Sequence, residues 1–160
     1  MRMHCIREGH KVLQTLLAAA MNFENSKMYP GLPEYFDNEG RGLYAYLTGA
    51  ASWYMLTMIT EVFGVKGDLG DLVIAPALLP EQFDENGNAG LKLEFAGRKF
   101  EIIIHNPEKK DLKAEQIRRA VCDEKVVLEP QPEYGVRLRK SVIEALEPKK
   151  CHRIDVIFHE

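Results

Sequence analysis

The sequence offers its clearest chemistry, anion binding, at a Thr48-Gly49 step that directly precedes an apolar run. With Thr48 as the N-cap of a helix, the backbone amides of the next three residues would be free at the helix start. These amides, the helix dipole and the threonine hydroxyl together suit an anion such as phosphate. Gly49 has no side chain, so a ligand could approach its backbone closely. The alternative is an ordinary helix cap with a small residue for tight packing.

The segment before this step, residues 22–47, has no clean hydrophobic period and is rich in proline and glycine. A connection of roughly 20 residues without regular structure is uncommon inside a compact domain, and is usually functional or disordered. Its several aromatic side chains argue against disorder, so we expect the segment to pack and to help wall a site. Within it, Arg41 could add positive charge near an anion or could pin the loop through a salt bridge.

Two helices must position these residues. Residues 4–21 carry apolar side chains at helical spacing and predict a one-faced helix. Residues 50–63 predict a second helix, with Gly64 as its C-terminal cap. This second helix is apolar around nearly its whole circumference, and such a helix must be buried between neighbours. Two helices and a loop cannot bury it, so the first half looks incomplete as a domain.

The second half of the chain changes to the period of β-strands. Residues 90–106 alternate around Ala96-Gly97 and predict a β-hairpin. Further strands are predicted at residues 72–74, 124–130, 135–140 and 152–159, a short helix at 141–148, and either a strand or a helical turn at 113–121. This half is therefore predicted to be mainly antiparallel β, most simply a small sandwich.

Composition excludes several classes of protein. The formal net charge is −3 and no dense Lys/Arg stretch occurs, which argues against a nucleic-acid partner. The three cysteines form no CxxC pair, so neither a disulfide framework nor a zinc site is predicted, and a reducing cytoplasm fits best. The apolar run after Trp53 is too short for a membrane span, which needs about 20 residues. We expect a cytoplasmic protein without a membrane partner, and expect His4 and His10 at its surface.

Three motifs together point to one family. YPGLPEY begins at Tyr29, GRGLYAYLTGAASW at Gly40 and GDLGDLVIAP at Gly67. In combination they resemble the C-terminal part of the inverting glycoside phosphorylases of glycoside hydrolase family 94, which include cellobiose, cellodextrin, laminaribiose and chitobiose phosphorylases. The resemblance runs over residues 29–79, and the strand-rich tail is similar more loosely.

The resemblance implies an α+β architecture. Residues 1–66 would be the last two helices and the active-site loop of an incomplete (α/α)6 catalytic barrel. Residues 67–160 would be a C-terminal antiparallel β-sandwich of the jelly-roll type. The family cleaves a β-linked disaccharide or oligosaccharide with inorganic phosphate and forms an α-sugar 1-phosphate with inversion. Phosphate thus replaces the water of an inverting hydrolase, as a co-substrate, and no cofactor or metal is implied.

The resemblance also assigns residues. The threonine-glycine pair that binds phosphate in the family matches Thr48 and Gly49, the same step that the helix-start reasoning selects. Possible members of the sugar-site wall, by contact or only by packing, are Tyr29, Glu34, Tyr35 and Arg41. Trp53 could be a sugar platform or a core residue. Glu34, Asp37 and Glu39 suggest the acid-base pair of a hydrolase, but the family's general acid lies upstream, so no catalytic residue is assigned here.

The family's enzymes are several times longer than this chain, so we expect the isolated chain to be inactive. Its partners would be carbohydrate and phosphate in the complete enzyme, and the rest of the barrel or a second copy against its apolar helix. Three interpretations stay open. The chain is the C-terminal part of a phosphorylase, a free-standing non-catalytic module that binds a partner chain or carbohydrate, or a remnant without function.

Overall fold

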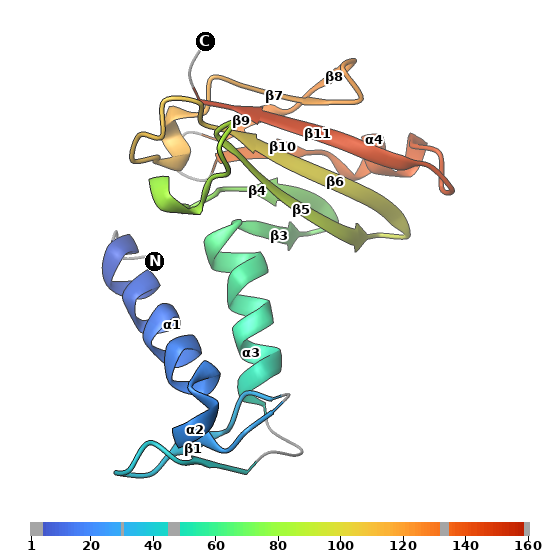
Figure 1. Cartoon of the computed structure of the whole chain (residues 1–160). Helices are drawn as coiled ribbons and strands as arrows, with labels where there is room; N and C mark the ends of the chain where they lie inside the picture. The colour runs from blue at the N-terminus through green and yellow to red at the C-terminus, as the bar shows by residue number, and fades with distance from the viewer. Residues whose placement is uncertain (1–4, 30, 45–48, 132–134, 159–160) are drawn as a thin grey trace. The chain divides into compact units, whose positions relative to one another are not determined.

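The computed structural model describes residues 5–29, 31–44, 49–131 and 135–158. The fold is α+β, with few helices and several small sheets (Figure 1). Two compact units form, Met1–Met58 and Ile59–Glu160. The division falls earlier in the chain than the expected boundary between residues 66 and 67. No helix in the described part of the chain combines the length and apolar character that crossing a membrane requires.

The first unit is mainly helical. Its elements are α1 (Ile6–Met21), α2 (Phe23–Ser26), β1 (Tyr35–Phe36), β2 (Gly42–Leu43) and α3 (Ala50–Thr57). The predicted helix at residues 4–21 is confirmed as α1. The surface position expected for His10 is wrong, since this residue of α1 is only 2% exposed. His4 lies outside the described residues.

Helix α3 is shorter than predicted. It ends at Thr57, and a five-residue π-helical segment, Met58–Val62, follows it. No residue of α3 is buried, and Trp53, Met55 and Leu56 are 68%, 60% and 46% exposed. The described residues therefore leave the apolar circumference of this helix largely open. Gly64 adopts a left-handed conformation with φ of 67°, as expected of the residue that ends such a helical run.

The second unit contains two sheets. The four-stranded sheet has the order β3-β4-β10-β9 and the five-stranded sheet the order β5-β6-β11-β7-β8. Their strands are β3 (Val65–Asp68), β4 (Asp71–Ile74), β5 (Asn88–Phe95), β6 (Arg98–His105), β7 (Arg119–Cys122), β8 (Val126–Val127), β9 (Glu129–Gln131), β10 (Gly135–Leu138) and β11 (Cys151–Ile157). The predicted mainly antiparallel arrangement is confirmed, with one exception among the described strands: β11 pairs with β6 in parallel. The five-stranded sheet is therefore mixed.

Alternating side chains build the core of this unit. In β6, Phe100, Ile102 and Ile104 are at most 1% exposed, while the residues between them are half-buried. In β11, Ile154 and Val156 are fully buried in the same way. Burying each such side chain contributes about 1.5–3 kcal/mol, so one face of the five-stranded sheet supplies much of the stability of the unit.

The predicted hairpin is confirmed in detail. Phe95 pairs with Arg98 across a two-residue turn, and Ala96 and Gly97 have φ of 49° and 70°. Two positive φ values are the signature of the type I′ turn, whose twist matches that of the flanking strands. The ambiguous segment at residues 113–121 divides into a 3-10 turn, Ala114–Gln116, and strand β7. The predicted short helix is α4, Lys140–Ala145.

A buried histidine ties the β7–β8 turn to the start of β11. His152 is 2% exposed, and its Nδ1 lies 2.8 Å from Oδ2 of Asp123 and its Nε2 2.8 Å from the Glu147 carbonyl. The other Asp123 oxygen accepts the Arg153 amide at 2.9 Å. Burial alone would raise the pKa of Asp123, but hydrogen bonds from His152, the Arg153 amide and Lys150 outweigh burial and lower the pKa to about 2.

We expect the variant Asp123→Asn to lower the free energy of unfolding by about 2 kcal/mol at neutral pH, as a pKa about two units low implies. Because the folded pKa lies below the unfolded value, the stabilisation is present above about pH 4 and is lost as the pH falls toward 2. Urea unfolding of both proteins between pH 7 and pH 2.5 measures this. A stability difference that stays constant down to pH 2.5 would contradict it.

Candidate functional site

The candidate site is the start of α3. The helix begins at Ala50 as predicted, but its N-cap residue lies one position later than predicted. Gly49, not Thr48, is the N-cap, with φ of −76° and ψ of −20°, and its carbonyl accepts the Trp53 amide at 2.9 Å. No side chain of Gly49 can cap the helix. Thr48 lies outside the described residues, so its predicted contact with phosphate stays a prediction.

A carboxylate already lies at this helix start. The Ala50 amide donates a hydrogen bond to Oε2 of Glu34 at 3.3 Å, across 16 positions of sequence. An acidic group is favourable there because the first amides of a helix are unpaired and carry partial positive charge. The start of α3 therefore binds an anionic oxygen of this unit itself, at the place where the sequence predicts an anionic ligand.

Glu34 is held there by the β1–β2 hairpin. Its amide donates to the carbonyls of Leu43 and Tyr44, at 3.1 and 3.4 Å, beside the pairing of Tyr35 with Leu43. Gly42 is needed in this hairpin, because a Cβ there would lie 2.6 Å from Cγ of Met28. The loop is thus folded back on itself, and this brings Glu34 close to α3.

An aspartate organises the tip of the same hairpin. Oδ1 of Asp37 accepts the amides of Glu39 and Arg41, at 2.9 and 2.8 Å, and the Asp37 amide donates to the Arg41 carbonyl. Gly40 completes the turn with φ of 80°. This fixes the backbone of Arg41, while its guanidinium has no hydrogen-bonding partner among the described residues. The salt bridge considered for Arg41 is therefore not seen in the described part of the chain.

The tyrosines predicted for the sugar-site wall are solvent-accessible. Tyr35 is 49% exposed, with its ring centroid 5.6 Å from that of Tyr44. Tyr29 is 79% exposed and packs edge-on against Phe23, at 5.0 Å between centroids. Among the described residues, the structure thus joins Glu34 to the helix start and sets Tyr35 next to it in β1. The ring contact that the described residues give Tyr29 is with Phe23.

Trp53 lies one turn into α3 and borders the same site. A Cβ built on Gly49 would lie 3.4 Å from Cδ1 and 3.6 Å from Nε1 of Trp53. The indole therefore covers one side of Gly49 while remaining largely exposed itself. Trp53 was considered either as a sugar platform or as a core residue. Since it is 68% exposed, it is not a core residue of the described part of the chain.

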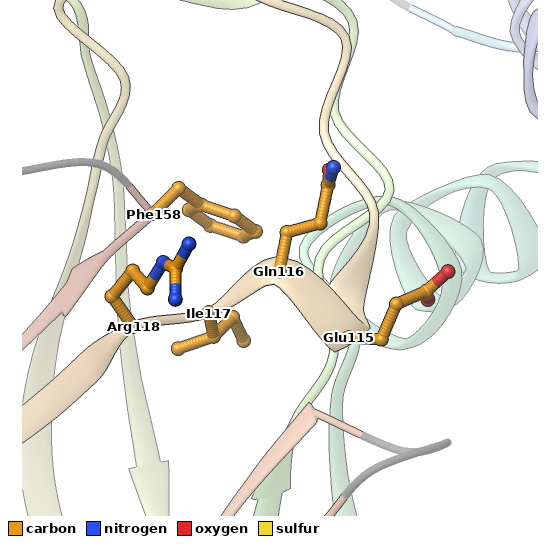
Figure 2. A pocket seen from close by; sticks show the side chains of 5 residues that line it. All are labelled: Glu115, Gln116, Ile117, Arg118 and Phe158. Carbon is orange, nitrogen blue, oxygen red and sulfur yellow. The ribbon is translucent and has the colours of Figure 1, made fainter.

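Several pockets lie away from the start of α3. In the second unit, a pocket of about 240 Å³ is lined by Glu115, Gln116, Ile117, Arg118 and Phe158. Figure 2 shows the Arg118 side chain beside the Phe158 ring, while Glu115 points away from both. In the first unit, an apolar groove of about 560 Å³ runs along α1 beside Phe36. Among the described side chains, no three His, Cys, Asp or Glu residues gather as metal ligands would.

Comparisons with known proteins add no assignment: no family model matches the chain, and no curated protein matches it. The resemblance to the phosphorylases therefore depends on the three motifs in the sequence.

Proposed function

We propose that this chain is the C-terminal part of an inverting glycoside phosphorylase, and that the start of α3 supplies part of its phosphate site. One observation carries the proposal. The Ala50 amide, one residue after the Thr48-Gly49 step, donates to a carboxylate oxygen at 3.3 Å, so this helix end holds an anionic oxygen. Phosphate presents the same kind of oxygen to the same kind of donor.

In the proposed reaction, phosphate attacks the anomeric carbon of a β-linked sugar while an aspartic acid from another part of the enzyme protonates the leaving oxygen. Gly49 and Thr48 would position the phosphate. Glu34 would not be the general acid, because the resemblance places that residue upstream of this chain.

The proposal extends to the finer architecture. Helices α1 and α3 would be the last helices of an (α/α)6 barrel, and the sheets of the second unit would form the C-terminal sandwich. The exposed apolar side chains of α3 support this, because a helix that is apolar on all sides requires neighbours. The complete enzyme would supply those neighbours, and the protein would act in the cytoplasm.

Glu34 and phosphate would compete for the same amide, so we expect the variant Glu34→Gln to bind inorganic phosphate more tightly. Removing one negative charge near 4 Å from the anion is worth about 1 kcal/mol in water, which corresponds to roughly a fivefold lower Kd. A phosphate titration of the chain followed by phosphorus NMR measures this. The variant Glu39→Gln, in the same hairpin, is the matched control. Weaker binding by Glu34→Gln would show that the carboxylate does not oppose phosphate.

The proposal is tested first on the native polypeptide. An antibody against this chain should detect, in a lysate of the source cells, a band several times larger than 18.2 kDa. The protein in that band should release sugar 1-phosphate from a β-linked disaccharide and phosphate, while the purified chain should release none. Release of sugar phosphate by the purified chain would contradict the expected division of the site.

A second function is favoured by one observation, the exposure of Trp53, Met55 and Leu56 on α3. A free-standing module could use this apolar surface to bind a partner chain or carbohydrate. A native band at 18.2 kDa, without phosphorylase activity in the fraction that contains it, would favour this module over the phosphorylase.

A further inference from the structure

Strand β5 forms one edge of the five-stranded sheet. It pairs along its whole length with β6, from Asn88 opposite His105 to Phe95 opposite Arg98. No strand of the described chain pairs with its other side. An eight-residue edge of this kind presents unpaired backbone groups and is a ready template for another strand.

Two observations show which backbone groups face outward. The Asn88 amide donates to Oδ1 of Asp84, and the Asn88 carbonyl accepts the Asp84 amide, so both groups of Asn88 point away from β6. At the other end, the two-residue turn makes Phe95 and Arg98 a hydrogen-bonded pair. Bonded and non-bonded pairs alternate along an antiparallel ladder. Both ends therefore require that the amides and carbonyls of Gly90, Lys92 and Glu94 face outward.

These three residues are open to a partner. All three are exposed, and the Lys92 side chain is 76% exposed. Their outward-facing amides and carbonyls make no hydrogen bond to other described residues. The outward side of β5 thus offers three amides and three carbonyls at the spacing of an antiparallel strand.

We propose that β5 pairs with β5 of a second copy of this chain, in an antiparallel, two-fold symmetric contact that joins two five-stranded sheets into one. In the register that we assign, Lys92 lies opposite the partner's Glu94, and Glu94 lies opposite the partner's Lys92. Leu93 then lies on the symmetry axis, opposite its own copy. Such a contact is isologous, so it closes as a dimer and does not grow into a fibre.

Charge complementarity selects this register. Lys92 already forms an ion pair with Glu101 of β6, at 3.1 Å between Nζ and Oε1, and Glu94 lies opposite Lys99. Joining two copies would extend these pairs into a row across four strands, in the order Glu101, Lys92, the partner's Glu94 and the partner's Lys99. Charges of opposite sign alternate along this row, and such cross-strand pairs are stabilising.

The other face of the strand agrees with the same register. Leu91, Leu93 and Phe95 alternate with the charged residues and are only half-buried. In the contact, Leu91 would lie opposite the partner's Phe95, and Leu93 opposite the partner's Leu93. Aliphatic and aromatic side chains that face each other across strands add stability of about 0.2–1 kcal/mol for each pair.

A register shifted by two residues, with Lys92 opposite the partner's Lys92, is disfavoured because like charges directly opposite each other repel. A lysine on an edge strand also commonly prevents pairing, by placing a charge at the new interface. On β5, Glu94 removes that protection. In the proposed register, Lys92 of each copy lies opposite Glu94 of the other, so its charge is paired at the interface.

Charge reversal tests both the contact and the register. Sedimentation velocity should give a dimer of twice 18.2 kDa for the unaltered chain of 160 residues. The variants Lys92→Glu and Glu94→Lys should each be monomeric, because each places like charges opposite each other. A mixture of the two variants should dimerise again. In the mixed dimer, the glutamates at positions 92 and 94 of one copy lie opposite the lysines at positions 94 and 92 of the other. The variant Lys149→Glu, on an exposed residue away from β5, should remain dimeric.

Amide hydrogen exchange checks the register independently. The amides of Lys92 and Glu94 should exchange more slowly as protein concentration rises, while the Gly90 amide, opposite the turn of the partner, should not. A monomeric chain, a dimer that survives both single charge reversals, or a mixture that stays monomeric would each overturn the proposal. None of these outcomes bears on phosphate binding, so the proposed function stands or falls separately.

Discussion

Replacing Gly64 by alanine is expected to destabilise the unit Ile59–Glu160 strongly. A Cβ at Gly64 would lie 1.9 Å from the Ala75 carbonyl oxygen and 2.2 Å from its carbon, far inside van der Waals contact. The clashing atoms belong to the backbone of Ala75, so no side chain can move away. This backbone is also held in place, because the Ala75 amide donates a hydrogen bond to the Gly64 carbonyl at 3.0 Å. Relief of the clash must therefore break the pairing at the start of the four-stranded sheet. We expect a loss of about 4 kcal/mol or more, a large fraction of the stability of a small domain.

The matched control is Gly97→Ala in the β5–β6 turn. Gly97 has φ of 70°, nearly that of Gly64, but a Cβ there meets nothing within 4 Å. Its substitution should cost only the left-handed conformation, about 1 kcal/mol. Urea unfolding of the two variants separates steric overlap from backbone preference. Equal midpoints for the two variants would show that the clash at Gly64 is relieved by a small shift.

The second large effect is expected from Gly49→Ala in the complete enzyme that we propose. The backbone of Gly49 has ordinary helical angles, and a new methyl group would lie 3.4 Å from Trp53, so the fold should tolerate alanine at about 1 kcal/mol or less. In the proposed site the methyl group would lie next to the first amides of the helix and would crowd a phosphate bound to them. Losing one such donor to a reacting anion costs about 100-fold in rate, so we expect a fall of that order in kcat/KM for phosphate.

The measurement compares the rates of Gly49→Ala and the unaltered enzyme over a range of phosphate concentrations, with thermal unfolding as the check on folding. Ala51→Gly, two residues further along the same helix, is a control that alters helix propensity but adds no atom. Unchanged phosphate kinetics in Gly49→Ala would remove Gly49 from the phosphate site, whatever the reaction of the enzyme.

Local patterns predicted the local elements well. The strict alternation of residues 90–106 and the Ala96-Gly97 turn were sufficient for the β5–β6 hairpin, because neighbouring strands and their turn lie in one stretch of sequence. Strand β3 was missed, since Val65–Asp68 is short and contains a glycine, which weakens the pattern of a strand. The parallel pairing of β6 with β11 was also missed. Alternation fixes which face a residue occupies, but it is the same for either strand direction.

At the candidate site, the helix start predicted near Ala50 is present, whereas the contact of Glu34 with it was not predicted. Glu34 was considered for the sugar-site wall, and the bond to the Ala50 amide depends on how the β1–β2 hairpin folds back across 16 residues. The signal that could have indicated this is Asp37 followed by Gly40, a combination typical of a tight turn. Recognising that turn would have predicted that the loop reverses and returns its carboxylate to α3.

The strand order of the five-stranded sheet has a consequence for synthesis. Strand β11 lies at the centre, between β6 and β7, yet it is the last strand in sequence. On the ribosome, the β5–β6 hairpin and the β7–β8 pair emerge first, and each has an open edge that only β11 can fill. Such long-range pairing is slow and leaves strand edges exposed while it is incomplete. The nascent chain therefore passes through an interval in which two partial sheets are present, and its strand edges are most exposed to other chains in that interval.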